Sequence, residues 1–137
     1  MSRERTILET YPTIVVVGAS SVESKPSHWV SQYMRRQGYR IIPVNPDERE
    51  VFGVPCYPDL ASVPERVAFV NVFRRPQYCA DVVREAIAVG AEVVWLQSGI
   101  RSADARALAE AAGLTFVQDR CVLQEHQRHR LGPVTPR

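Results

Sequence analysis

The sequence has few of the features that mark a secreted, membrane-spanning or nucleic-acid-binding protein. Its only cysteines, Cys56, Cys79 and Cys121, are odd in number and far apart, which argues against a disulfide framework and favours a reducing compartment. No apolar run approaches the roughly 20 residues that a membrane-spanning helix needs, so no membrane contact is expected. The net charge is only +2 and the basic residues are spread along the chain, so nucleic acid is not an expected partner.

The sequence also shows neither a secretory signal nor a convincing metal-binding motif. Charges in residues 1–12 are not followed by an apolar segment, which predicts no secretory signal and, with the cysteine pattern, a cytoplasmic protein. No two cysteines have the CxxC spacing of a zinc site. His126 and His129 have a spacing that suits a metal, but the basic sequence around them predicts solvated side chains. No metal is therefore expected.

The sequence does have enough apolar residues for one core. Hydrophobic residues make up 45% and charged residues 23% of its 137 positions, a globular composition. It contains no internal repeat and no linker that would separate two domains. We therefore predict one domain over residues 1–137, with an N-terminal helix or arm over 1–10 and a loose tail over 128–137.

Apolar runs alternate with helical patterns along the chain. The continuous run at 13–18 is typical of a strand buried on both faces of a parallel sheet. Helices are predicted where Pro76 suits a first helical position and where Ser102 can cap an N-terminus. Repeated strand–helix units predict an α/β domain, a three-layer Rossmann-like open parallel sheet of about five strands with helices on both faces. The predicted strands are 13–18, 39–46, 66–73, 91–97 and 114–119, and the predicted helices are 26–38, 76–90 and 102–112.

Polar and basic residues follow the predicted strands. Ligands of such sheets bind beyond the carboxyl ends of the strands, so these residues belong together. The loop at 18–22 offers backbone N–H groups and two hydroxyls to an anion, with the ammonium of Lys25 close by in sequence. Arg74 and Arg75, between a strand and a helix-initiating proline, add guanidinium groups suited to phosphate. The sequence thus predicts a site for a phosphorylated ligand.

The first loop departs from the dinucleotide-binding pattern. Of the glycines in G-x-G-x-x-G it keeps Gly18 alone, and strand two ends in Asn45 and Pro46 instead of the acidic residue that binds a ribose hydroxyl. These departures make NAD a poor candidate. NADP and coenzyme A, which carry additional phosphate, both remain open.

Several short motifs then resemble one family. They are VVGAS (16–20), KPS (25–27), GYRIIPVNP (38–46), CYPDL (56–60), NVFRRP (71–76), VWLQSGI (94–100) and DRC (119–121) followed by Glu125 and His126. In this order they resemble the small bacterial and archaeal CoA-binding proteins, single Rossmann-like domains similar to the CoA-binding domain of the succinyl-CoA synthetase α subunit. One departure is Asn71, where relatives commonly have aspartate. The resemblance implies coenzyme A or a short acyl-CoA as the ligand.

The resemblance also implies a role for each loop. The loop at 18–22 would take the diphosphate, with Lys25 and Ser27 beside it, and the residues after strand two would line the pantetheine or ribose. The residues after strand three would flank the adenosine 3′-phosphate, and those after strand four would close the far wall. The implied binding residues are Gly18, Ala19, Ser20, Ser21, Val22, Lys25, Ser27, Asn45, Pro46, Phe73, Arg74, Arg75, Gln97, Ser98 and Gly99.

No nucleophile and base can be paired in the sequence, so we expect a non-catalytic binding module with no catalytic residue. The alternatives are an NADP-dependent reductase fragment, an acyl-CoA-handling enzyme subunit that needs a partner, and a regulator that binds another nucleotide. His28 is either a general acid or base or a solvated side chain. Cys56 and Cys121 are either buried or able to form a mixed disulfide with CoA. The acyl group, a protein partner and a homodimeric state stay open.

Overall fold

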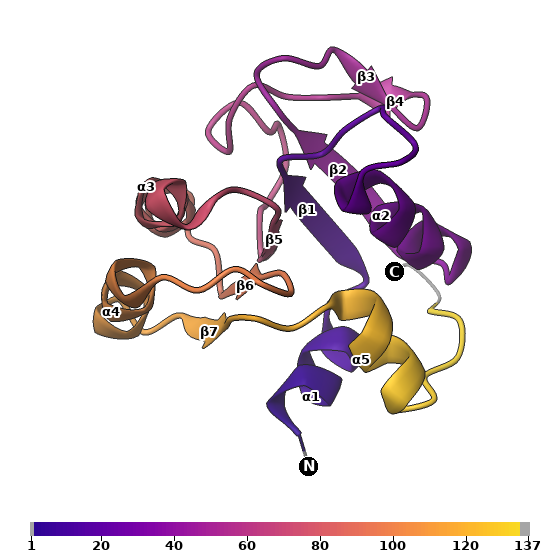
Figure 1. Ribbon diagram of the computed structural model, residues 1–137. Coiled ribbons are helices and arrows are strands. Elements are labelled where there is room, and N and C mark those ends of the chain that lie inside the picture. The colour runs from indigo at the N-terminus through magenta and orange to yellow at the C-terminus, as the bar shows by residue number, and fades with distance from the viewer. Residues whose placement is uncertain (1, 135–137) are drawn as a thin grey trace.

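A parallel sheet with strand order β2-β1-β5-β6-β7 forms the centre of the molecule (Figure 1). The structure is a computed structural model that describes residues 2–134. A short antiparallel hairpin, β3 (Glu50–Val51) and β4 (Val54–Pro55), forms a separate two-stranded sheet. The strands of the main sheet are β1 (Thr13–Val17), β2 (Arg40–Val44), β5 (Phe69–Val72), β6 (Val93–Leu96) and β7 (Thr115–Val117).

Helices cover both faces of the sheet, which confirms the predicted three-layer α/β fold (Figure 1). One face packs against α1 (Arg3–Thr10), α2 (Pro26–Arg36) and α5 (Val122–Arg128), and the other against α3 (Pro76–Ala88) and α4 (Ala103–Ala111). The residues at which four of these helices begin are explained by N-capping side chains and by proline. The hydroxyls of Ser2 and Ser102 each accept a backbone N–H at the N-cap of α1 and α4, and α2 and α3 each begin with proline. None of the helices within 2–134 combines the length and apolar character needed to cross a bilayer.

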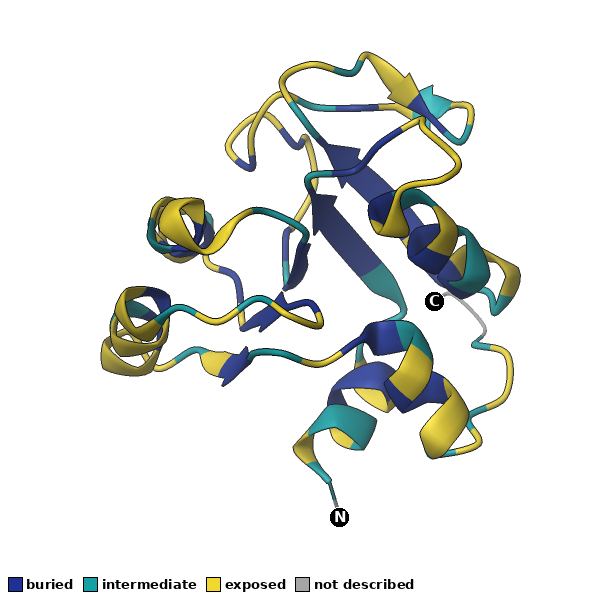
Figure 2. Ribbon diagram, in the orientation of Figure 1, coloured by how far each residue is buried: buried dark blue, intermediate teal, exposed yellow. Residues whose placement is uncertain are grey.

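Alternate residues of each strand point into two separate cores. In β1, Val15 and Val17 pack toward α3 and α4, whereas Ile14 and Val16 pack toward the other three helices. The central strands are buried on both sides (Figure 2), which explains why they have continuous apolar sequences rather than alternating ones.

The strand order reverses at β1. The chain leaves β1 through α2 to reach β2 on one side, and later places β5 on the other side of β1. Such a switch point opens a crevice beyond the carboxyl ends of the two strands, here β1 and β5. The fold therefore selects, from all strand ends, one pair where a ligand can enter.

The end of the chain returns to α2. Up to Val134 the segment predicted as a loose tail is held in place, because the N–H of Val134 donates to the carbonyl of Gln37 at 2.5 Å and Leu131 and Val134 pack on the core. Residues 135–137 lie outside the described residues. At the N-terminal end of the chain, the segment predicted as a helix or arm contains α1, which buries Ile7 and Leu8.

His126 is buried, so the prediction of a solvated side chain there is wrong. It is 1% exposed, and its Nε2 donates to the carbonyl of Gly132 at 3.2 Å while its Nδ1 accepts from the hydroxyl of Tyr33 at 2.8 Å. Burial lowers the pKa of His126. The reason for the difference is tertiary, since α5 turns this histidine under two tyrosine rings, those of Tyr33 and Tyr39.

Candidate ligand site at the switch point

The loops after β1 and β5 touch at Gly18. The φ angle of Gly18 is +90°, and a Cβ atom there would lie 2.8 Å from the carbonyl oxygen of Phe73 and 3.4 Å from the side chain of Arg74. Only glycine fits this close approach without strain. The structure thus brings Gly18 against Phe73 and Arg74, which lie more than fifty positions later in the sequence.

The loop from β1 to α2 is shaped by its own polar groups. The hydroxyl of Ser20 accepts the N–H of Val22 at 3.0 Å, and Nδ1 of His28 donates to the carbonyl of Ser20 at 2.8 Å. Ala19, Ser20 and Ser27 are buried, whereas the residues from 21 to 26 are exposed. His28 therefore holds the loop from its side facing α2, where its ring also contacts that of Phe52 at a tilt of 44°.

Lys25 and Val22 stand on the open side of this loop. Lys25 is the N-cap of α2, and its side chain makes no capping hydrogen bond there. The side chain of Val22 is exposed, and so is that of Trp29 on α2. Because the N-terminus of α2 lies beside the loop, its dipole adds to the positive potential that Lys25 provides.

Asn45 ties the end of β2 to this loop. Its Nδ2 donates to the carbonyl of Ala19 at 2.7 Å, and its Oδ1 accepts the N–H of Asp47 at 2.9 Å. A carboxylate has no hydrogen to donate to Ala19, which is a physical reason for an amide where dinucleotide-binding folds have an acid. Asn45 thus positions the loop, and Pro46 follows it on the exposed rim.

Glu48 is a residue of the site that the sequence analysis did not identify. One of its carboxylate oxygens accepts the backbone N–H of Ser21 at 2.6 Å, and both accept its hydroxyl, at 2.8 and 2.9 Å. These hydrogen bonds, helped by the charge of Lys25, lower the pKa of Glu48. A signal was available, because Glu48 is the first glutamate after the strand whose end is acidic in dinucleotide-binding folds.

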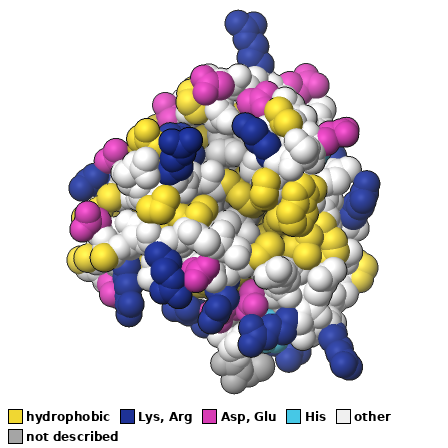
Figure 3. Space-filling view, viewed as in Figure 1, with side chains coloured by type: hydrophobic (Ala, Val, Ile, Leu, Met, Phe, Trp, Pro, Cys, Tyr) yellow, Lys and Arg dark blue, Asp and Glu magenta, His cyan; other side chains and the backbone are white. Residues whose placement is uncertain are grey.

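The predicted cations are not neutralised by neighbouring carboxylates. Within residues 2–134, Lys25, Arg74 and Arg75 form no ion pair, while nine other pairs are present. The guanidinium of Arg74 lies 4.8 Å from the ring centroid of Tyr78, and Arg75 is the exposed N-cap of α3. Figure 3 shows positive side chains dispersed among acidic ones on the face that it views, rather than gathered in a stripe.

A cavity of about 230 Å³ opens beside these groups. Its wall includes Pro46 and Arg74, two of the predicted binding residues, and two carboxylates from Asp59 and Glu85. Glu85 also accepts the backbone N–H of Leu60 at 3.3 Å. The cavity joins the end of β2 with Arg74, just before α3, and with Val82 and Glu85 in the middle of that helix.

The loop after β6 is different. The buried side chain of Gln97 donates from Nε2 to Oδ1 of Asn71 at 2.8 Å, which satisfies both groups inside the sheet. Ser98 and Gly99 are exposed, but the N–H of Gly99 donates to Asp119 at 2.7 Å. The structure therefore places the three residues predicted for the far wall at the next strand end, where the side-chain amide of Gln97 and the N–H of Gly99 are already bonded.

All cysteines are buried. Cys56 lies beside the site, with its Sγ 3.7 Å from the carbonyl oxygen of Asn45, and burial raises the pKa of its thiol. Burial raises the pKa of Cys79 to about 11. Both shifts reduce the thiolate fraction that disulfide exchange needs. Among residues 2–134, no group of three His, Cys, Asp or Glu side chains is arranged to hold a metal ion.

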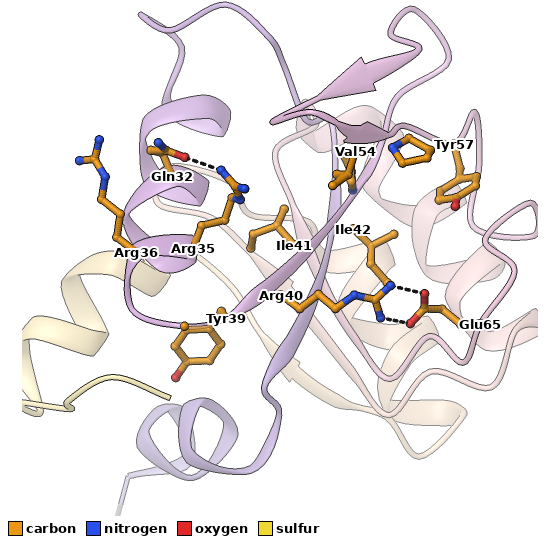
Figure 4. A pocket seen from close by; sticks show the side chains of 13 residues that line it. Gln32, Arg35, Arg36, Tyr39, Arg40, Ile41, Ile42, Val54, Tyr57 and Glu65 are labelled. Carbon is orange, nitrogen blue, oxygen red and sulfur yellow. Dashed lines mark hydrogen bonds and ion pairs between the residues drawn. The ribbon is translucent and has the colours of Figure 1, made fainter. Parts of the chain in front are cut away.

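A larger cavity lies elsewhere, along the outer edge of β2 between α2 and the β3–β4 hairpin (Figure 4). It has a volume of about 520 Å³. Part of its polar lining is paired internally, because Arg40 binds Glu65 and Arg35 donates to Gln32. Arg35 and Arg36 line it and form no ion pair within residues 2–134, but no loop that follows β1 or β5 contributes to its wall. The smaller crevice at the switch point, where such loops meet, is therefore the better candidate site.

Comparisons with known proteins identify the family to which the fold belongs. A family model described as "CoA binding domain" matches residues 12–127. "Uncharacterized protein YneT" of Bacillus subtilis (strain 168) is 36% identical over 120 residues, which cover 88% of this chain and 89% of that protein. A solved structure, "hypothetical protein from Pyrococcus horikoshii OT3", is 38% identical with a TM-score of 0.88, and the match covers 91% of this chain and 88% of that one.

A third relative is much longer. Acetate–CoA ligase (ADP-forming) I of Archaeoglobus fulgidus is 40% identical over 58 residues, which make up 42% of this chain and 8% of the ligase. The likeness thus concerns a small part of that enzyme.

Proposed function

The chain belongs to the family of CoA-binding domains, and we propose that it binds coenzyme A or a short acyl-CoA at the crevice between β1 and β5 without catalysing a reaction. The observation that carries this proposal is that three basic residues without ion pairs among the described residues adjoin the loop that begins at Gly18. Arg74 lies against Gly18, Arg75 follows it in the chain, and Lys25 ends the loop at the start of α2. Coenzyme A has a diphosphate and a ribose 3′-phosphate, so it matches a site with several cations.

The geometry suggests where each phosphate binds. The exposed backbone from Ser21 to Lys25 and the start of α2 suit the diphosphate, because a helix N-terminus attracts anions. Arg74 and Arg75, at the start of α3, suit the 3′-phosphate, since a guanidinium can bind phosphate through two parallel hydrogen bonds. Pro46 and the adjoining cavity of about 230 Å³ would contact an uncharged part of the ligand.

The surroundings of the reactive side chains support a non-catalytic role. His28 uses one ring nitrogen to hold Ser20 and packs its ring against Phe52, a positioning role in the loop. The thiols of Cys56 and Cys79 have raised pKa values. Neither arrangement has the nucleophile and base within hydrogen-bond distance that covalent catalysis requires.

A second candidate is a subunit that presents acyl-CoA to a separate enzyme. It is favoured by the likeness to part of an ADP-forming acetate–CoA ligase. This candidate uses the same ligand and the same crevice, and differs only in needing a protein partner.

A thermal-unfolding series with CoA, acetyl-CoA, dephospho-CoA, NAD and NADP at equal concentration tests the proposal. A ligand at 100 times its Kd adds about 2.7 kcal/mol to the free energy of unfolding and raises Tm by several degrees. We expect a shift with CoA and acetyl-CoA, a smaller one with dephospho-CoA and none with NAD. A shift with NADP and none with either form of CoA would reject the proposal in favour of a reductase.

A further inference from the structure

The carboxylate of Glu48 occupies the position in the loop where an anion is expected. It accepts the backbone N–H of Ser21 at 2.6 Å and the hydroxyl of the same residue at 2.8 Å. A phosphate oxygen bound to this loop would use these same two donors. In the structure, the protein therefore supplies its own anion to the loop after β1.

This carboxylate is held by contacts that a ligand can replace. Glu48 is only half-buried and Ser21 is exposed, so exchanging their hydrogen bonds for others leaves no donor in an apolar environment. Of the described cations, Lys25 is the one whose charge acts on Glu48, but no ion pair joins the two side chains. No buried salt bridge has to be broken when Glu48 leaves.

The backbone near Glu48 need not move for this exchange. Asn45 holds the turn through its bonds to the N–H of Asp47, at 2.9 Å, and to the carbonyl of Ala19, at 2.7 Å. The N–H of Glu48 donates to the carbonyl of Asn45 at 3.3 Å. Rotation of one glutamate side chain about its own bonds is therefore enough to free Ser21.

We propose that Glu48 is a specificity-determining residue, an internal anion that competes with the ligand's diphosphate for Ser21 and is displaced when the ligand binds. This inference rests on the proposed function, because it concerns the same loop. The consequence is that a ligand binds this loop only if its anionic group binds more strongly than the carboxylate of Glu48. A diphosphate, which also gains contacts to Lys25 and the start of α2, displaces the carboxylate, whereas a ligand with a single weak anionic group does not.

The experiment compares Glu48→Gln with the wild type and with Asp47→Asn. Both substitutions remove one negative charge from the same turn, but Asp47 has no side-chain bond to Ser21. Isothermal titration calorimetry with CoA and, separately, with inorganic pyrophosphate gives the Kd of each protein. Two unit charges about 4 Å apart in water interact by enough to change a Kd about fivefold. We expect Glu48→Gln to bind both probes about fivefold more tightly, and Asp47→Asn to differ from wild type by less than twofold.

A second readout follows the amide of Ser21 by two-dimensional NMR. In the wild type this amide should shift on adding pyrophosphate, because its acceptor changes from carboxylate to phosphate. Equal affinities for Glu48→Gln and Asp47→Asn, or weaker binding by Glu48→Gln, would overturn the inference while leaving CoA binding intact. If Glu48→Gln binds pyrophosphate more tightly than the wild type but none of the three proteins binds CoA, the inference is supported and the proposed function is rejected. No binding of either probe to any of the three proteins would overturn both.

Discussion

The loops after β1 and after β6 lie at the same edge of the sheet and share one arrangement. Each donates a backbone N–H to a carboxylate from the loop after a neighbouring strand: Ser21 to Glu48 at 2.6 Å, and Gly99 to Asp119 at 2.7 Å. In both cases the hydrogen bond lowers the pKa of the carboxylate. Judged by their backbone donors alone, the two loops would be equally good anion sites.

They differ in what surrounds the carboxylate. Asp119 also accepts from Nε of Arg101 at 3.0 Å, so this loop has an acid and a base that neutralise each other. Arg120, whose charge also acts on Asp119, forms no ion pair within residues 2–134. The other loop, in contrast, adjoins two consecutive arginines without ion pairs there, Arg74 and Arg75. The comparison teaches that free cations next to the loop, more than backbone donors, distinguish a ligand site from a well-bonded turn.

The largest effect on CoA binding is expected from substituting the glycine of one loop, Gly18, and not that of the other, Gly99. Gly18→Ala should abolish detectable CoA binding, because the new Cβ would lie 2.8 Å from the carbonyl oxygen of Phe73 and push the two loops apart. Gly99→Ala is the matched control, since Gly99 also has a positive φ, +83°, but nothing within 4 Å of its Cβ position. Each variant loses roughly 1 kcal/mol of stability from backbone strain. Calorimetric titration with CoA should find binding only in Gly99→Ala, and equal loss in both would contradict the comparison.

The arginines give the next largest effect. Replacing Arg74 and Arg75 together by alanine should weaken CoA binding on the order of 100-fold, since charge-assisted hydrogen bonds to phosphate would be lost. Dephospho-CoA, which lacks the 3′-phosphate, should be affected much less. Arg101→Ala removes a cation that is already paired with Asp119 and should leave both affinities within about twofold. If the double variant weakens both ligands equally, the 3′-phosphate has been assigned to the wrong residues.

His126 lies outside both loops, so its titration should change the stability of the fold without changing the difference between the loops. Its pKa is lowered from 6.5 by burial, so the unfolded chain takes up a proton first as the pH falls. The free energy of unfolding should therefore be constant above about pH 6.5 and decrease below it. Urea unfolding at several pH values measures this, and the decrease should disappear in His126→Gln. A decrease that persists in the variant would belong to another group.

The smallest effect is expected at Asp119. Asp119→Asn keeps an acceptor for the N–H of Gly99, and asparagine tolerates the positive φ of 57° at this position. CoA affinity should change by less than about twofold, because the substitution alters a loop that we do not assign to the phosphates. Since hydrogen bonding lowers the pKa of Asp119, its contribution to stability is lost only as the pH falls below the ordinary aspartate range, and the variant should show less acid destabilisation. A large change in CoA affinity would bring the loop after β6 into the site.

The sequence by itself determined the elements and the chemistry at their ends. Continuous apolar runs placed the five strands of the main sheet, and Pro76 and Ser102 placed helix starts, because these signals act within a few residues of the chain. Gly18 and the pair Arg74 and Arg75 were recognisable as residues that follow a strand.

Only the tertiary structure decided which strand ends are neighbours and which polar groups remain free. The strand order sets β5 beside β1 and leaves β6 one strand further away. The bond from Ser21 to Glu48 spans 27 positions, and the one from Tyr33 to His126 spans 93. Sequence periodicity reports which face of an element is buried but not which distant side chain it will meet. That partner is fixed when the strands are ordered and the helices pack, and with it the difference between a free cation and a paired one.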